Sequence, residues 1–187
     1  PHDMMFDSPG GDPLEAQARV GRIVAVKGAH AVILVDADDG LNHRRPPEIG
    51  TLLRVDTPRS ISLCMVSALS SPLPSHAAEE QELRIVEVEF IGELPKDENG
   101  TPTSFRRGIS CYPSLGDILF RASRDELGKA YACDSDSAIR VGHIAQEPAI
   151  PAMIKIDDML GKHFALLGTT GTGKSCTVAL VLRRMLE

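Results

Sequence analysis

The sequence predicts a small β-barrel followed by the beginning of an α/β domain. Short runs of β-branched residues, separated by clusters of Gly, Pro, Asp and Asn, fill most of the 187 residues. This pattern is typical of a small barrel or sandwich, and a closed barrel is preferred because closure removes exposed strand edges. Near the C-terminal end the pattern changes to a glycine-rich loop between an apolar run and a helix.

The barrel is expected to occupy residues 18–150, with about six or seven strands and one short helix. Its first two strands, 22–26 and 31–35, are joined by a turn in which Gly28 can supply the positive φ of a tight hairpin. Further strands are predicted at 51–56, 61–69, 83–92, 117–121 and 139–144.

Local sequence patterns predict the structure of three further segments. Residues 86–90 alternate between apolar and acidic side chains, which indicates a half-buried strand with a solvated outer face. The sequence from Ser123 to Glu126 fits a capping box, so a helix should begin there and end before residue 134. Residues 1–17 are rich in Pro and Gly and are expected to form a flexible N-terminal arm.

Composition excludes some classes of protein. The net charge of −6 argues against a surface that grips nucleic acid broadly, because phosphate contacts need clustered Lys and Arg. The four cysteines lack metal-binding spacing, so reduced thiols of a cytoplasmic protein are expected. No apolar stretch approaches the roughly 20 residues that a membrane span needs.

Residues 168–175 read G-T-T-G-T-G-K-S and give the strongest chemical signal in the chain. A G-x-x-x-x-G-K-[ST] string indicates a phosphate-binding loop when it lies between a buried strand and a helix. The apolar run at 164–167 predicts the strand, and apolar residues at helical spacing over 178–185 predict the helix. The loop therefore predicts a site for a nucleoside triphosphate, ATP with Mg²⁺.

Each residue type in the loop suits one part of the triphosphate. Glycine lets the backbone N–H groups come close to the phosphates and form an anion cradle, and the helix start adds its positive dipole end. Lys174 should reach the β- and γ-phosphates and is the catalytic candidate, while Ser175 should bind Mg²⁺. Thr169 and Thr170 either bind or only rigidify the loop. The predicted cofactor-binding residues are Gly168, Thr169, Thr170, Gly171, Thr172, Gly173, Lys174, Ser175 and Cys176.

Phosphoryl transfer needs more groups than this cradle. It requires an acid near Mg²⁺, which normally ends a later strand of the same sheet, a group that orients water and often an arginine finger, and no further strand is predicted between the loop and residue 187. The helix after the loop is apolar nearly all round, which is typical of a helix buried on most of its surface. Residues 151–187 are therefore expected to be the incomplete start of a P-loop domain in a truncated ATPase, and the chain alone should be inactive.

Two segments resemble the HerA family of hexameric, ATP-driven DNA translocases, which are related to FtsK. One is FRRGISCYPSLGD at 105–117, and the other is 154–175, which ends in GKHFALLGTTGTGKS. The resemblance implies a HAS-type barrel, shared with rotary ATP synthase subunits, followed by a RecA-like motor. It implies a helicase or translocase that acts on DNA through the motor, a ring-shaped homo-oligomer, and docking of a NurA-like nuclease.

Two other functions stay open. A rotary ATPase subunit shares both the barrel and the loop, although the Thr169-Thr170 start and the 105–117 segment favour the translocase. The chain could also act as a non-catalytic oligomerisation or docking module. Light scattering separates this last alternative from the others, because a docking module should form a stable oligomer without nucleotide.

Overall fold

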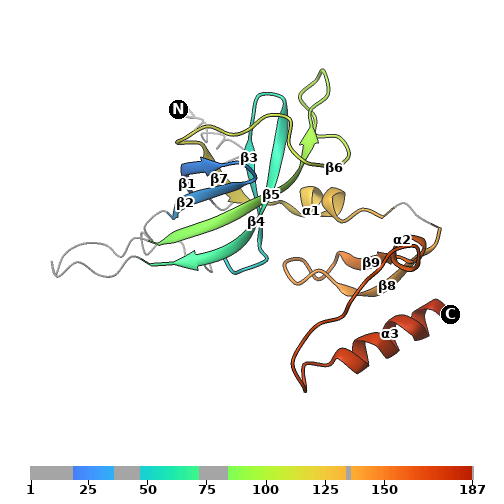
Figure 1. Cartoon of the computed structure of the whole chain (residues 1–187). Helices are drawn as coiled ribbons and strands as arrows, with labels where there is room; N and C mark the ends of the chain where they lie inside the picture. The colour runs from blue at the N-terminus through green and yellow to red at the C-terminus, as the bar shows by residue number, and fades with distance from the viewer. Residues whose placement is uncertain (1–18, 36–46, 72–83, 134–135, 187) are drawn as a thin grey trace, which may run out of the picture. The chain divides into compact units, whose positions relative to one another are not determined.

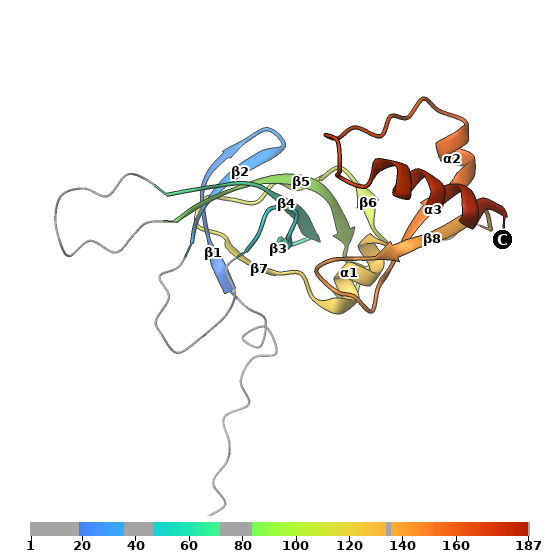
Figure 2. The same ribbon diagram turned by 90° about the horizontal axis from the view of Figure 1, so that it is seen from below.

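The computed structural model describes residues 19–35, 47–71, 84–133 and 136–186 (Figures 1 and 2). The expected N-terminal arm, 1–17, lies outside these residues. Contacts divide the chain into one unit of residues 1–123 and a second of residues 124–187. This division falls after Ser123, and the expected domain boundary after residue 150 stays a prediction.

The first unit contains a closed antiparallel barrel. Its strands are β1 (Arg19–Lys27), β2 (His30–Val35), β3 (Leu52–Asp56), β4 (Ser60–Ser70), β5 (Ile85–Pro95), β6 (Arg106–Arg107) and β7 (Ile118–Arg121). They are ordered β2-β1-β7-β3-β4-β5-β6, and a further pairing of β2 with β5 closes the barrel. Six strands thus form the closed barrel and β6 adds to the edge of β5 (Figure 1). The predicted closed barrel is confirmed.

Tight turns and bulges shape the barrel. Lys27 pairs with His30 across the first hairpin, and Gly28 has φ +58°, as the hairpin prediction requires. The β3–β4 turn is fixed by the Thr57 hydroxyl, which donates to the Ser60 carbonyl at 2.7 Å. Register shifts interrupt β1 and β4, and such bulges increase the bend and twist that closure needs.

The barrel interior is filled by β-branched and leucine side chains. Along β5 the apolar residues of the 86–90 run are buried and the glutamates between them are exposed, so the predicted alternation is confirmed. Burial of each such side chain stabilises the fold by roughly 1.5–3 kcal/mol. The core cluster is Val20, Ile23, Ala31, Ile33, Leu53, Val55, Cys64, Val66, Val86, Val88, Phe90 and Leu119.

The segment 105–117 packs against β4 and β5: the Ser62 hydroxyl donates to the Cys111 carbonyl at 3.5 Å, and the Tyr112 ring meets the Phe90 ring edge-on. Arg106 and Arg107 pair with Glu93 and Gly92 to form β6. A Cβ atom at Gly92 would lie 2.5 Å from the Phe105 ring and 2.2 Å from the Arg106 carbonyl, so only glycine permits this close approach. The segment thereby covers residues that would otherwise form a solvated strand face.

A buried carboxylate lies beneath this segment. Glu93 is 7% exposed and accepts hydrogen bonds from the Ser60 hydroxyl and from the Ser110 hydroxyl and N–H, each at 3.0 Å. Burial by itself raises the pKa of Glu93, but the Ser110 and Ser60 hydrogen bonds and the charge of Arg106 bring it below the ordinary value. Glu93 is therefore held as a hydrogen-bonded anion.

The second unit contains three helices and a two-stranded sheet among its described residues. They are α1 (Arg124–Ala130), β8 (Ala138–His143), β9 (Pro151–Lys155), α2 (Ile156–Leu160) and α3 (Lys174–Leu186). The helix predicted from the capping box is confirmed, because α1 begins directly after Ser123. The predicted strand at 139–144 corresponds to β8, which pairs antiparallel with β9.

One predicted element of the second unit is wrong. Residues 164–167 were expected to form a buried strand before the phosphate loop, yet residues 163–169 have no regular structure. Phe164 is 66% exposed and Leu167 is 88% exposed. A central strand needs hydrogen-bonding neighbours on both sides, and none of the strands in the described residues pairs with 164–167. The sheet of a P-loop domain is therefore not formed by this run.

Candidate phosphate-binding loop

The glycine-rich loop adopts a conformation that its glycines alone permit. Gly171 has φ +86° and Gly173 has φ +85°, and both values lie in the region that side chains with a Cβ atom rarely adopt. Alternation of such residues with ordinary ones turns successive N–H groups toward a common side, which makes an anion-binding concavity. The loop backbone is thus suited to a phosphate group, as its sequence predicts.

Thr172 holds the loop in a tight turn. Its hydroxyl donates to the Thr169 carbonyl at 2.8 Å, and its N–H donates to the same oxygen at 3.4 Å. A Cβ atom at Gly168 would lie 2.7 Å from that hydroxyl, so a larger residue there would displace it. Thr169 therefore braces the loop through its carbonyl, and its role toward a phosphate stays a prediction.

Lys174 lies at the junction of the loop and the helix. It is the first residue of α3, and its ammonium group donates a hydrogen bond to the Thr169 carbonyl. The side chain therefore curls back over the loop and places its positive charge beside the backbone cradle. Ser175 and Cys176 follow in the first turn of α3, where the positive end of the helix dipole is strongest.

The helix after the loop exposes its apolar side chains. No residue of α3 is buried, and Val178, Leu182 and Leu186 are 45%, 55% and 90% exposed. A helix that is apolar nearly all round needs cover on most of its surface. Among the described residues, α3 therefore leaves its apolar side chains without cover.

These residues fit the phosphates of a nucleotide. The two positive-φ glycines supply the cradle, and Lys174 supplies a cation. Ser175 occupies the position of the motif whose hydroxyl binds Mg²⁺. Within the described residues no group of three or more His, Cys, Asp or Glu side chains could hold a metal ion.

None of the helices that the structure describes combines the length and apolar character needed to cross a bilayer.

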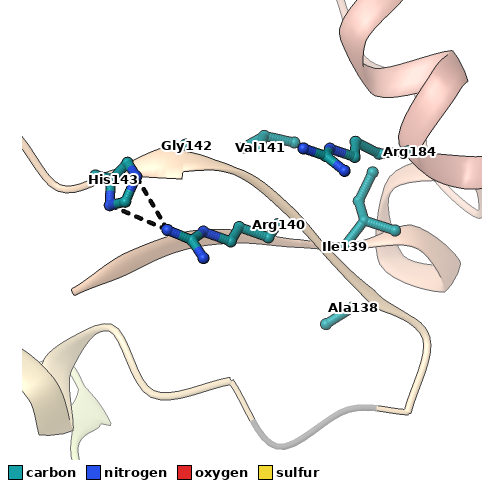
Figure 3. Close-up of a pocket in the computed structure, with 7 residues that line it drawn as sticks. All are labelled: Ala138, Ile139, Arg140, Val141, Gly142, His143 and Arg184. Carbon is teal, nitrogen blue, oxygen red and sulfur yellow. Dashed lines mark hydrogen bonds between the residues drawn. The ribbon is translucent and has the colours of Figure 1, made fainter. Parts of the chain in front are cut away.

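Sequence reasoning missed two features of the molecule. It did not single out Glu93, because segment 105–117, which is distant in the sequence, buries this residue. The alternation along β5 gives no sign of that cover. It also did not predict a cavity beside β8, which is lined partly by a residue of α3 that lies far away in the sequence (Figure 3). The only signal for the cavity was the presence of Arg140 and His143 on one predicted strand.

The C-terminal part of the chain is similar to known helicases. The family "Helicase HerA, central domain" matches residues 139–187. The DNA double-strand break repair helicase HerA of Pyrococcus furiosus is 31% identical over 72 residues, which are 38% of this chain and 12% of that protein. A probable helicase of Methanocaldococcus jannaschii is 29% identical over 73 residues, which are 39% of this chain and 14% of that protein.

The chain therefore spans only a small part of the length of the curated relatives that it matches. The matched family region begins within β8 and includes β9, α2, the phosphate loop and α3. The resemblance predicted from the residues of 154–175 is thus confirmed in the region that carries the loop. Residues 139–187 of the chain are thus similar to the central domain of HerA helicases.

Proposed function

We propose that the chain is the ATP-binding and assembly part of a DNA-translocating motor or helicase of the HerA type. The observation that carries this proposal is the loop 168–175, whose positive-φ glycines lead directly into α3 at Lys174. The match of residues 139–187 to the HerA central domain supports the same function.

The loop is proposed to bind ATP with Mg²⁺ through the residues 168–176. The N–H groups around Gly171 and Gly173 would surround the β-phosphate, and Lys174 would leave the Thr169 carbonyl to contact the β- and γ-phosphate oxygens. When bound, Mg²⁺ would supply positive charge that neutralises the phosphate oxygens. Ser175 would hold the metal from the first turn of α3.

Nucleotide binding is tested by calorimetric titration of the chain with ATP and Mg²⁺. Lys174→Ala should weaken binding by about tenfold or more, because a charge-assisted hydrogen bond contributes about 1.5–3 kcal/mol. Lys162→Ala is the matched control, since Lys162 pairs with Asp158 outside the loop. Equal affinity of the Lys174 variant and the unsubstituted chain would contradict the proposal.

Hydrolysis is a separate question from binding. The chain by itself should turn over no ATP above background, because water activation and an arginine finger require groups that the loop does not supply. In a longer protein that carries this sequence, we expect ATP hydrolysis that DNA stimulates. Hydrolysis that is indifferent to DNA would remove the translocase function and favour a rotary ATPase subunit.

A second function belongs to the barrel. It closes on itself and buries its own apolar residues, which supports a module that folds without the motor and assists assembly. Formation of a ring, hexameric in the HerA family, and docking of a NurA-like nuclease stay predictions of this function. A chain that is a monomer by light scattering at high concentration would count against independent assembly by the barrel.

A further inference from the structure

The outer surface of the barrel carries opposite charges on the two strands that flank β2. On β1, Arg22 and Lys27 are exposed and form a basic strip. On β5, Glu87 and Glu89 are exposed and form an acidic strip. Because β2 pairs with both β1 and β5, it separates the two strips (Figure 1).

The strand register places the two strips at matching levels of the barrel. His30 of β2 is the partner of Lys27 on one side and of Glu89 on the other. One row across three strands therefore runs from a cation to an anion. Arg22 and Glu87 lie farther along the same strands and are exposed as well, so each strip presents two charges of one sign.

An exposed apolar residue lies within the basic strip. Val24 is 44% exposed, and the register of β1 against β2 shifts between Ile23 and Ala25, so Val24 is the extra residue of a β-bulge. The solvated face of an antiparallel sheet is normally polar. An apolar residue between two charged ones is the arrangement of a protein–protein interface, with an apolar centre and a polar rim.

Closure of the barrel turns the two strips away from each other. The strands β1 and β5 lie on opposite sides of β2 in a closed barrel of six strands, so their outer faces point in different directions. Opposite charges on two separate faces of one chain suit a head-to-tail contact, in which the basic strip of one copy meets the acidic strip of the next. A two-fold contact of either strip with itself would bring like charges together.

We infer that copies of this chain associate head to tail through their barrels, an inference that rests on the assembly role proposed for the barrel. The basic strip with Val24 on one copy contacts the acidic strip, Glu87 and Glu89, on the next. Such contacts link copies into a ring where the rotation between them closes and into a filament where it does not. No residue of the loop 168–175 takes part.

The test is sedimentation velocity of the 187-residue chain over a range of concentrations. We expect association that increases with concentration and weakens as salt is added, because salt screens exposed charges. Lys27→Glu and Glu89→Lys each reverse one charge of one strip. Each should weaken association by at least about tenfold, since like charges then face each other across the contact. Lys27→Gln and Glu89→Gln, which only remove a charge, should weaken it less.

A mixture of the two charge-reversal variants gives the most specific measurement. Each variant alone places like charges opposite each other where Lys27 of one copy meets Glu89 of the next. Between Lys27→Glu and Glu89→Lys, however, every facing position again has opposite charges. An equimolar mixture should therefore regain most of the association that each variant has lost, and this recovery would also show that both variants are folded.

Two matched controls change the net charge by the same amount outside the strips. Arg59→Glu lies in the turn between β3 and β4, and Glu98→Lys lies between β5 and β6. Both side chains are exposed, and neither substitution should alter association.

The outcomes separate the contact from the assembly role. An oligomer that neither charge-reversal variant weakens, or a mixture no more associated than its two components, would overturn the head-to-tail contact and leave the assembly role standing. A chain that stays a monomer at every concentration would overturn both.

Discussion

Leucines in the core of the barrel are fully buried, whereas leucines around the phosphate loop are exposed. Leu53 in β3 and Leu63 in β4 are 0% exposed, while Leu167 and Leu182 are 88% and 55% exposed. The sequence pattern is apolar in both regions. The difference teaches that an apolar run forms a strand only where other strands supply its hydrogen bonds and cover.

Thiol chemistry should give the largest contrast between the two regions. Burial raises the pKa of Cys64 in the barrel core to about 12 from 9.0, which lowers its thiolate fraction about 1000-fold near neutral pH. Cys176, in the first turn of α3, is exposed. With a maleimide or iodoacetamide, Cys176 should react at least about 1000-fold faster than Cys64.

The measurement is peptide mass spectrometry after timed alkylation of the native chain. Unfolding in guanidinium should abolish the contrast, which serves as the control. Addition of ATP and Mg²⁺ should slow the reaction of Cys176 if the loop binds nucleotide. Comparable rates for Cys64 and Cys176 in the native chain would show that the barrel core is open to reagent.

Leucine truncation should give the next largest difference. Leu53→Ala should lower the free energy of unfolding of the barrel by about 2–5 kcal/mol, because it removes core contacts and leaves a cavity. Leu182→Ala is the matched variant and should change the free energy of unfolding by less than about 0.5 kcal/mol, since the Leu182 side chain is exposed and Ala favours a helix. Denaturation with urea measures both, and equal effects would remove the contrast between the regions.

Loss of the Glu93 charge should have a smaller effect, confined to the barrel. Glu93→Gln should destabilise it by about 1–3 kcal/mol near pH 7, because the hydrogen bonds from Ser60 and Ser110 lose their anionic acceptor. The folded state lowers the pKa of Glu93 below its ordinary value of 4.5. The ionised carboxylate therefore contributes its full stabilisation of the barrel above about pH 4.5, and this stabilisation is lost as the pH falls through the folded-state pKa.

The pH dependence makes this prediction specific. The unsubstituted barrel should lose stability below about pH 4.5, and the Gln variant should show a shallower loss over the same range. Glu87→Gln on the exposed face of β5 is the control and should leave the profile nearly unchanged. Parallel profiles for the Glu93 variant and the unsubstituted chain would mean that Glu93 does not titrate with folding.

Most of the barrel could be predicted from the sequence because its strands are locally patterned. The β5 alternation and the Gly28 turn carry the information for strand and hairpin in adjacent residues. Glu93 could not be predicted as buried, because its cover comes from segment 105–117, and such a contact between distant parts of the chain leaves no local periodicity.

The conformation of the loop 168–175 follows from its sequence, since Gly171 and Gly173 have the φ values that only glycine adopts easily. The strand at 164–167 was predicted wrongly, because an apolar run of four residues has no periodicity that separates a strand from an irregular segment. The cavity beside β8 depends on Arg184 coming close to β8, which is a tertiary contact.

The sequence alone determined the positive-φ glycines of the loop 168–175, the start of α3 at Lys174, the hairpin at Gly28 and the apolar alternation of β5. Each of these follows from residues that are neighbours along the chain, because turn conformation and side-chain phase are local properties. Only the tertiary structure decided the closure of β2 on β5, the burial of Glu93 and the lining of one cavity by Arg184 together with the residues of β8. These depend on contacts between residues far apart in the sequence, which local patterns do not specify.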